Sequence, residues 1–364
     1  MRGTPKIESV HAAAYRIPTD LPEADGTYAW NSTTLVTVHV RGGGRVGFGY
    51  SYGNAAMAQL VRDKLASCVC GRDAFSVEGA LDAMLYEVRN TGRPGMVAMA
   101  ISAVDAALWD LKAKLLDLAL VDLLGAVREA APIYGSGGFT TYTLEQLRGQ
   151  LGGWVEQGIP RVKMKVGSHP ERDVERVRQA RAAIGRDTAL MVDGNGAYSR
   201  KQALAMAEAF AEQGVCWFEE PVSSDDLEGL HVLRDRAPAG MAIAAGEYGY
   251  DMFYFRRMLD AGAVDVLQAD ATRCLGITGF LVAARLCQAH CMPFSGHCAP
   301  LLHMHPACAA TPLIHLEYFH DHARIERMLF DGFVSPSGGA LRPDRSRPGL
   351  GIELKQRDAE RYAV

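Results

Sequence analysis

The chain has 364 residues, of which 48% are hydrophobic, and it carries 38 basic against 42 acidic residues. This length suffices for one large domain and a smaller one. The balanced charge argues against a nucleic-acid patch or a polybasic membrane segment, and the apolar runs are too short and interrupted to span a bilayer. The first ten residues, MRGTPKIESV, contain no apolar signal core. We expect a cytoplasmic protein that binds neither nucleic acid nor membrane.

The first third of the chain predicts a small antiparallel sheet followed by helices. The stretch TTLVTVHVRGGGRVGFGYSYG predicts two strands around a glycine turn at residues 42–44. A phosphate-binding loop is the alternative, but no helix start with Lys-Ser/Thr follows it. Residues from about 55 to 124 have helical periodicity, clearest in VAMAISAVDAALWDLKAKLLD, with Gly125 near its end. We assign residues 1–131 to an α+β unit.

Short apolar strands alternate with helical segments from residue 132 onward, as in parallel α/β folds. Two helices are predicted to begin with capping boxes, Ser168 to Glu171 and Ser199 to Gln202. Eight strands are predicted: PIYGS, RVKMKV, ALMVD, VCWFEE, MAIAAGE, VDVLQAD, MPFSGH and LIHLE. This count favours a (β/α)8-type barrel over residues 132–339. The alternative, a doubly wound sheet, does not require eight units, and no G-x-G-x-x-G follows the first strand.

The residues after Glu317 are polar and turn-rich. We expect them to leave the barrel, with residues 340–364 packing back on the first unit.

The eight cysteines are too few to form a disulfide scaffold in a chain of this length. Most lie in apolar stretches, which is typical of small core residues. The spacings of Cys68/Cys70 and Cys287/Cys291 resemble metal or redox pairs, but no second pair follows at zinc-site spacing. A reducing compartment is the simplest interpretation.

The run RVKMKVG places Lys163 and Lys165 on one face of a strand, because side chains alternate along it. Lysine is rarely buried without a partner. The later strands also end in ionisable residues: Asp193, Glu219, Glu247, Asp270, His297 and Glu317. The carboxyl ends of barrel strands meet at one face, where barrel active sites lie. We expect these side chains to converge, although each alone would more often be a helix cap, a loop residue or a structural histidine.

Three carboxylates on consecutive strands, Asp193, Glu219 and Glu247, predict a site for a hard divalent cation, Mg²⁺ or Mn²⁺. Of the two acids in FEEP, we expect one to point into the barrel and the other toward its wall. Two adjacent ammonium groups near a cation repel one another, and with desolvation this should lower the pKa of at least one lysine, which could then be a general base. Asp270, one strand before His297, could orient its imidazole.

The ordered motifs resemble those of the enolase superfamily, mandelate racemase subgroup. They are AISAVDAALWDLKAK, KMK, VDGN, FEEP, GE, DATRCLGITG, SGH, LE and PGLG, and they cover nearly the whole chain. The resemblance implies an N-terminal α+β capping domain over a modified (β/α)7β barrel. It also implies a homo-oligomer and a small-molecule carboxylate substrate.

The resemblance implies that Asp193, Glu219 and Glu247 bind Mg²⁺, which chelates the substrate carboxylate. Lys165 would be the base on one face of the α-carbon. Lys163 would help hold the carboxylate and lower the pKa of Lys165. A metal-stabilised enediolate with such a base is typical of these sites.

The opposite face would be served by His297 paired with Asp270. Glu317 would be protonated and donate a hydrogen bond to the enediolate, and Asn195 would contact the substrate. Loss of a β-hydroxyl gives a 2-keto-3-deoxy acid, whereas reprotonation on the opposite face gives racemisation or epimerisation. Acid-sugar dehydration is the commoner activity of the subgroup, so we favour dehydration of an aldonic or aldaric acid.

Residues 17–33, IPTDLPEADGTYAWNST, resemble the mobile loop of the capping domain. Tyr28 and Trp30 are candidate substrate-binding residues, and packing under the hairpin is the alternative for both. Tyr50 and Tyr52 are further candidates for the cavity wall. Tyr248 follows the GE motif, where a smaller polar residue is expected, so the substrate stays open.

Two histidine pairs, His303/His305 and His320/His322, suggest a metal hydrolase of amidohydrolase type. Such enzymes usually place H-x-H on the first barrel strand, whereas HMH here lies in a predicted helix, and the lysines would stay unexplained. A non-catalytic protein on the same scaffold is a third possibility. Such a non-catalytic protein should have lost an acid, a base or a metal ligand of the active site. In this sequence all of these residues are present.

Overall fold

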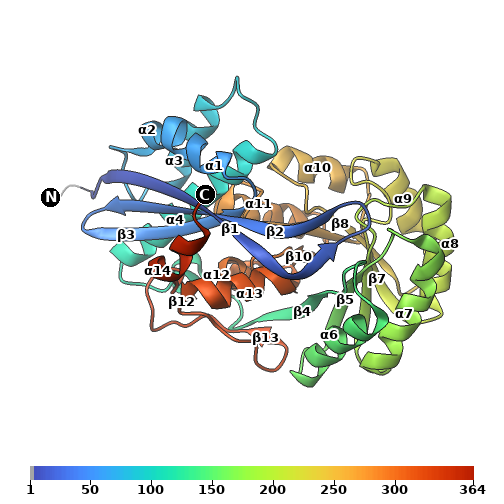
Figure 1. Cartoon of the computed structure of the whole chain (residues 1–364). Coiled ribbons are helices and arrows are strands. Elements are labelled where there is room, and N and C mark those ends of the chain that lie inside the picture. Colours follow the sequence, from blue (N-terminus) through green and yellow to red (C-terminus); the bar gives the residue numbers. More distant parts are fainter. Residues whose placement is uncertain (1–3) are drawn as a thin grey trace.

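The computed structural model describes residues 4–364, and its first unit is a three-stranded antiparallel sheet packed on helices (Figure 1). The strands are β1 (Ile7–Ala24), β2 (Ala29–Gly42) and β3 (Arg45–Tyr52). The helices are α1 (Ala56–Leu60), the π-helical turn η1 (Val61–Leu65), α2 (Ala66–Val69), α3 (Val77–Glu87), α4 (Met96–Leu115) and α5 (Leu120–Leu124). The predicted hairpin and the helical region are confirmed, whereas β1 has no counterpart among the predicted strands. Gly125 ends α5 rather than the long helix α4.

Residues 17–33 form paired strand ends rather than the predicted loop. Glu23 pairs with Trp30 and Ala24 with Ala29 across the turn, where the Asp25 carboxylate accepts the Tyr28 backbone N–H at 2.7 Å. The hairpin tip lies on the barrel, because the Ala24 carbonyl accepts the backbone N–H of Thr140 at 2.9 Å. The first unit therefore reaches over the barrel through this hairpin, as the long β1 and β2 ribbons in Figure 1 show.

The second unit is a closed barrel of eight parallel strands, confirming the eight predicted ones. Its strands are β4 (Ala131–Gly137), β5 (Arg161–Lys165), β6 (Ala189–Asp193), β7 (Val215–Glu219), β8 (Ala242–Ala245), β9 (Val266–Ala269), β10 (Phe294–Gly296) and β11 (Leu313–Phe319). The helices between them are α6 (Leu144–Glu156), α7 (Pro170–Ile184), α8 (Arg200–Ala211), α9 (Leu227–Arg236), α10 (Met252–Asp260), α11 (Gly276–Ala289) and α12 (Pro300–Ala309). Pairing of β11 with β4 closes the sheet, which gives the expected (β/α)7β order.

The two predicted capping boxes have different outcomes. Ser199 and Gln202 form the predicted box at the start of α8. The box at Ser168 is wrong, because α7 begins at Pro170 and the Ser168 hydroxyl instead donates to the Asp25 carbonyl at 2.5 Å. The Ser168 hydroxyl therefore forms a hydrogen bond with the hairpin of the first unit, whereas the sequence pattern predicted that it caps a helix.

Two buried aspartates of α4 join the first unit to the rest of the chain. Asp110 accepts backbone N–H groups from Phe48 at 2.7 Å and Leu350 at 2.6 Å. Asp105 accepts the Thr278 hydroxyl on α11 at 2.6 Å. Buried carboxylates are tolerated when their oxygens are hydrogen-bonded in this way, so these acids fix the helix on the barrel.

The segment after β11 begins with a helix rather than turns. Its elements are α13 (His320–Leu329), β12 (Phe330–Asp331), β13 (Ala340–Leu341), β14 (Glu353–Leu354), α14 (Gln356–Ala359) and the 3-10 turn η2 (Glu360–Tyr362). β13 pairs with β4 of the barrel, and the Val364 backbone N–H donates to the Ala14 carbonyl of β1 at 3.1 Å. The tail therefore contacts both units. Within residues 4–364, the search for a helix of the length and apolarity needed to cross a bilayer finds none.

Candidate active site

The ionisable residues at the strand ends converge at the carboxyl face of the barrel. Two lysines come from β5, and Asp193 and Glu219 end β6 and β7. The others are Glu247 after β8, Asp270 after β9, His297 after β10 and Glu317 on β11. All eight side chains belong to buried residues, none more than 5% exposed. The predicted convergence is therefore what the structure shows.

Three of these carboxylates form a compact oxygen cluster. Asp193, Glu219 and Glu247 each place an oxygen within 4.8 Å of the others. Glu219 is oriented by the Trp217 indole and the Gln268 amide, which both donate to its Oε2 at 3.0 Å. Burial and the nearby Asp193 raise the pKa of Glu219 to about 8. An all-oxygen, negatively charged donor set of this kind fits Mg²⁺ or Mn²⁺.

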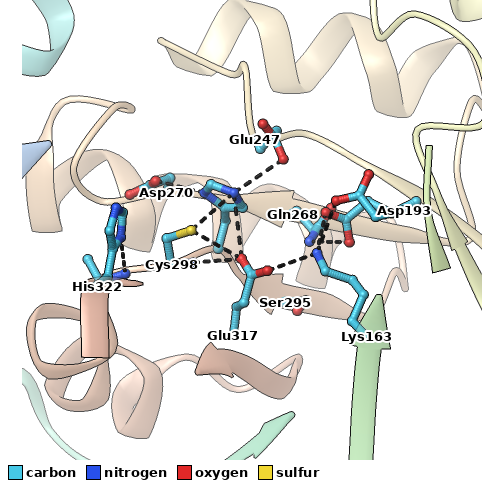
Figure 2. Close-up of polar contacts among 12 residues, drawn as sticks. Lys163, Asp193, Glu247, Gln268, Asp270, Ser295, Cys298, Glu317 and His322 are labelled. Carbon is cyan, nitrogen blue, oxygen red and sulfur yellow. Dashed lines mark hydrogen bonds and ion pairs between the residues drawn. The ribbon is translucent and has the colours of Figure 1, made fainter. Parts of the chain in front are cut away.

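The two lysines are buried because each is paired with carboxylates. Lys163 Nζ lies 2.5 Å from Glu219 Oε1, 2.9 Å from Glu317 Oε1 and 3.4 Å from Asp193 Oδ2, and Figure 2 shows it pointing into this group. Lys165 Nζ lies 2.5 Å from Asp193 Oδ2. The two ammonium groups on one strand face thus balance the acids that arrive from the neighbouring strands.

The predicted lowering of a lysine pKa assumes a cation beside the two ammonium groups and stays a prediction; without that cation both lysine pKa values are raised. Burial lowers the pKa of Lys165, but the adjacent Asp193 carboxylate, with Glu247 and Glu317, outweighs it and holds the pKa above its usual value. The pKa of Lys163 is raised for the same kind of reason, chiefly by Glu219 and Glu317 against the effect of burial. Without a cation, the attraction of these carboxylates outweighs both burial and the repulsion between the two lysines.

His297 and Asp270 form the expected pair. His297 Nδ1 lies 2.9 Å from Asp270 Oδ2, and Asp270 Oδ1 accepts the Thr272 backbone N–H at 2.7 Å. With its Nδ1–H donated to Asp270, a neutral His297 ring presents the Nε2 lone pair to the site. Nε2 lies 3.2 Å from Glu247 Oε2. Burial lowers the pKa of His297, but Cys298, Glu247, Glu317 and Asp270 outweigh it and raise the pKa well above the usual value.

Glu317 lies between two cationic partners, with its Oε1 2.9 Å from Lys163 Nζ and its Oε2 3.5 Å from His297 Nε2. Burial raises its pKa, but Lys163 and His297 outweigh burial and bring the pKa below its usual range. Its Oε2 accepts the Cys298 backbone N–H at 3.0 Å. Glu317 is therefore paired with these cations in the structure, and its protonation toward an enediolate stays a prediction.

Asn195 and Glu220 lie next to the carboxylate cluster. Asn195 is 8% exposed, its backbone N–H donates to Asp193 Oδ1 at 3.0 Å, and its own Oδ1 finds no hydrogen-bond partner among residues 4–364. A buried acceptor without a partner is costly, so Asn195 is suited to meet a ligand. Glu219 points into the barrel. Glu220 is also fully buried, and burial with the Glu247 and Asp193 charges raises its pKa well above the usual value.

The aromatic candidates of the first unit divide into exposed and buried residues. Tyr28 is 69% exposed and stacks on Trp30, with 6.1 Å between ring centroids. Trp30 packs edge-to-face on Phe139 at 5.7 Å and donates its indole N–H to Glu23 at 2.7 Å. Phe139 belongs to a buried cluster with Cys298. Trp30 therefore lies closer to the candidate site than Tyr28 does, and Glu23 is a buried neighbour that the sequence did not indicate.

The other two tyrosines are buried between the units. Tyr50 donates its hydroxyl to Glu326 at 2.6 Å, and Tyr52 stacks on His322 with ring centroids 3.5 Å apart. These contacts indicate packing between the first unit and the barrel.

The histidine pairs make separate structural contacts. His303 Nε2 accepts the Ala271 N–H at 2.7 Å, whereas His305 lies 3.0 Å from the Leu350 carbonyl. His320 lies 2.9 Å from Asp20, and His322 accepts the Ala299 N–H at 3.3 Å. The two histidines of each pair contact different backbone or side-chain groups. This argues against a hydrolase metal site in which both histidines of an H-x-H motif bind one ion.

Two further side chains contact the site and were missed by the sequence reading. Arg273 Nη1 lies 3.3 Å from Glu247 Oε1, and its Nε lies 3.6 Å from Asp270 Oδ2. Cys298 Sγ lies 3.3 Å from His297 Nε2. Their position in DATRC and directly after SGH was the available signal, since both motifs follow barrel strands.

Comparisons with known proteins place the whole chain in one family. The model described as mandelate racemase / muconate lactonizing enzyme, N-terminal domain matches residues 10–125, and the enolase C-terminal domain-like model matches residues 146–359. The chain is 32% identical to 3,6-anhydro-alpha-L-galactonate cycloisomerase from Streptomyces coelicolor, over 98% of this chain and 99% of that one. It is 33% identical to L-talarate/galactarate dehydratase from Salmonella typhimurium, over 85% of this chain and 77% of that one.

Solved structures agree with these matches. A mandelate racemase/muconate lactonizing enzyme-like protein from Rubrobacter xylanophilus shares 56% identity and a TM-score of 0.97, over 99% of this chain and 100% of that one. A racemase from Streptomyces coelicolor A3(2), solved with bound magnesium, shares 31% identity and a TM-score of 0.93, over 98% and 100% of the two chains. The chain therefore belongs to the mandelate racemase / muconate lactonizing enzyme family and is an enolase-superfamily enzyme.

Proposed function

We propose that this enzyme removes the proton α to the carboxylate of an acid sugar and then eliminates water, in a Mg²⁺-dependent reaction. The observation that carries the proposal is the order of groups around the barrel. Lys165 comes from β5 and His297 from the end of β10, and between them in strand order lie the three clustered carboxylates. Relatives named as arabinonate and L-rhamnonate dehydratases, 28% and 32% identical over 88% of this chain, support the substrate class.

Asp193, Glu219 and Glu247 would hold the Mg²⁺ ion. When bound, the ion supplies positive charge beside the substrate carboxylate, where negative charge develops as the α-proton leaves. Lys163 and Asn195 would hold the same end of the substrate, since the Lys163 side chain and the Asn195 backbone N–H both contact the cluster.

Lys165 would accept the α-proton at Nζ, which requires it to be neutral when substrate is bound. A divalent cation on Asp193 would compete with the ammonium group for that carboxylate and so lower the lysine pKa. His297 would donate its Nε2 proton to the leaving β-hydroxyl, and Asp270 would hold the ring in place through Nδ1. The C–H and C–O bonds break, water leaves, and the resulting enol tautomerises to a 2-keto-3-deoxy acid.

Two other outcomes share the first step. Return of a proton from His297 to the opposite face would give a racemase or epimerase. Cycloisomerisation of an anhydro sugar acid is a third outcome, favoured by the cycloisomerase that is 32% identical over nearly the whole chain. The substrate that reacts and the product that forms together distinguish all three.

The test is a screen of the Mg²⁺-loaded enzyme against aldonic, aldaric and anhydro sugar acids in D₂O, followed by NMR. A 2-keto-3-deoxy product formed from an aldonic or aldaric acid would support the dehydratase if it disappears in Lys165→Ala and His297→Asn but persists in the exposed controls Lys201→Ala and His290→Asn. The same kind of product formed only from an anhydro sugar acid would indicate a cycloisomerase instead. An epimeric product with α-deuterium and no keto acid would replace it with an epimerase. No reaction of any sugar acid would exclude the proposed substrate class.

Metal dependence has a separate readout. Mg²⁺ should raise the melting temperature of the wild-type enzyme, because a ligand that binds only the folded state stabilises it. Glu219→Gln should remove most of this shift, whereas Glu228→Gln on the surface of α9 should retain it. An equal shift in both variants would exclude the three-carboxylate site.

A further inference from the structure

A second set of potential metal ligands lies beside the carboxylate cluster. Cys298 Sγ is 3.3 Å from His297 Nε2 and 3.3 Å from Glu317 Oε2, and His297 Nε2 is 3.5 Å from Glu317 Oε2. All three residues are buried. Figure 2 shows the thiol of Cys298 turned toward the Glu317 carboxylate. Sulfur, nitrogen and oxygen atoms thus form one small triangle at the ends of β10 and β11.

The dimensions of this triangle match a zinc site. Tetrahedral Zn²⁺ with its usual bond lengths to sulfur, nitrogen and oxygen separates those ligand atoms by about 3.4 to 3.6 Å. The observed separations of 3.3 to 3.5 Å need only a small expansion to admit the ion. A hydrogen-bonded triangle of this size is therefore also close to a preformed coordination shell with its fourth position free for water or substrate.

The residues around the triangle hold it in place. Asp270 Oδ2 lies 2.9 Å from His297 Nδ1. Histidines that bind zinc commonly donate their other ring N–H to a carboxylate in this way. Cys298 and Ala299 have φ angles of 52° and 38°, a backbone conformation that L residues adopt rarely. The Cys298 N–H donates to Glu317 Oε2, so the unusual backbone fixes the thiol next to both partners.

The ligand chemistry separates this triangle from the carboxylate cluster. Thiolate and imidazole favour zinc over magnesium, whereas three carboxylates favour magnesium. A thiolate, a carboxylate and a neutral imidazole carry two negative charges, which a divalent ion balances. Binding would release the thiol proton to solvent.

We propose that His297 Nε2, Cys298 Sγ and Glu317 Oε2 form a second metal site that binds Zn²⁺ and related thiophilic ions. The bound ion takes the Nε2 lone pair of His297. If His297 is the acid of the proposed reaction, as argued above, Zn²⁺ inhibits the Mg²⁺-loaded enzyme.

The site is tested by adding Co²⁺ to the Mg²⁺-loaded protein and recording its absorption spectrum. A thiolate ligand gives a sulfur-to-cobalt charge-transfer band in the near ultraviolet, whereas cobalt at an all-oxygen site does not. We expect this band in the wild-type protein and its removal by excess Zn²⁺. Cys298→Ser should abolish it, while Cys308→Ser, a buried cysteine of α12 outside the triangle, should retain it.

Two more variants make the assignment specific. His297→Asn should weaken Co²⁺ binding at least tenfold, and Glu219→Gln should leave the band intact, because the two sites share no ligand. The proposal is overturned if no band forms, if Cys298→Ser retains it, or if Glu219→Gln removes it. These spectra do not depend on turnover, so they decide the site even if no sugar acid reacts. If a substrate is found, Zn²⁺ that binds without slowing turnover would exclude the inhibitory role.

Discussion

Replacing Asp270 with asparagine should impair one face of the active site and spare the other. The substitution keeps the size of the side chain but removes the charge that faces His297 Nδ1 at 2.9 Å. A hydrogen bond to a charged group contributes about 1.5 to 3 kcal/mol, which corresponds to a rate loss of about 10- to 100-fold if the bond is needed in the transition state. Lys165 contacts Asp193 instead, so its step should be unaffected.

The assay is deuterium exchange at the α-carbon, measured by NMR for the two epimers of a substrate found in the screen. The epimer whose proton faces His297 should exchange more slowly in Asp270→Asn, and the epimer whose proton faces Lys165 should exchange at the wild-type rate. The pH profile of the slowed reaction should also move to lower pH, because the Asp270 carboxylate raises the pKa of His297.

Asp265→Asn is the matched control, since this residue lies just before β9 while Asp270 lies just after it. Asp265 accepts a hydrogen bond from Arg234 at 3.1 Å, far along the strand from the candidate site. Equal slowing of both epimers in Asp270→Asn would refute the pairing argument and indicate a general loss of structure. Slowing of the reaction by Asp265→Asn would lead to the same conclusion.

Two further predictions concern stability, measured as the free energy of unfolding in urea. Ser199→Ala should cost about 1 kcal/mol because it removes a formed capping box, whereas Ser199→Asp, which keeps a side-chain acceptor at the N-cap, should cost much less; equal losses in the two variants would contradict this. Burial raises the pKa of Glu326 to about 8 from 4.5, so the folded chain holds a proton that the unfolded chain releases. This stabilisation is complete below pH 4.5 and is lost as the pH rises through 8, so stability should fall across that window. The fall should be smaller in Glu326→Gln but unchanged in the exposed control Glu353→Gln, and equal slopes in all three proteins would rule out Glu326 as the cause.

The sequence by itself determined the barrel and the identity of the groups at its carboxyl face. Strand periodicity put Lys163 and Lys165 on one face, and the regular succession of strand and helix put an ionisable residue at each later strand end. Barrel closure brings those ends together whatever the details of packing, so spacing along the chain was enough to predict convergence. The hairpin of β2 and β3 and the cap at Ser199 are equally local, and both are confirmed.

Only the tertiary structure decided the directions of the pKa shifts, the path of the first hairpin and the position of Cys298 beside His297 and Glu317. The pKa of Lys165 depends on the balance between its burial and the attraction of carboxylates on other strands. Neither the depth of burial nor the distances to those carboxylates can be derived from the sequence. The lowered pKa of Glu317 has the same origin, since Lys163 and His297 lie on other strands. The Ser168 hydroxyl does not cap a helix, because it donates instead to the carbonyl of Asp25, which is 143 residues away along the chain. Electrostatic and hydrogen-bond energies depend on distance and burial in space, and these become defined only when the chain has folded.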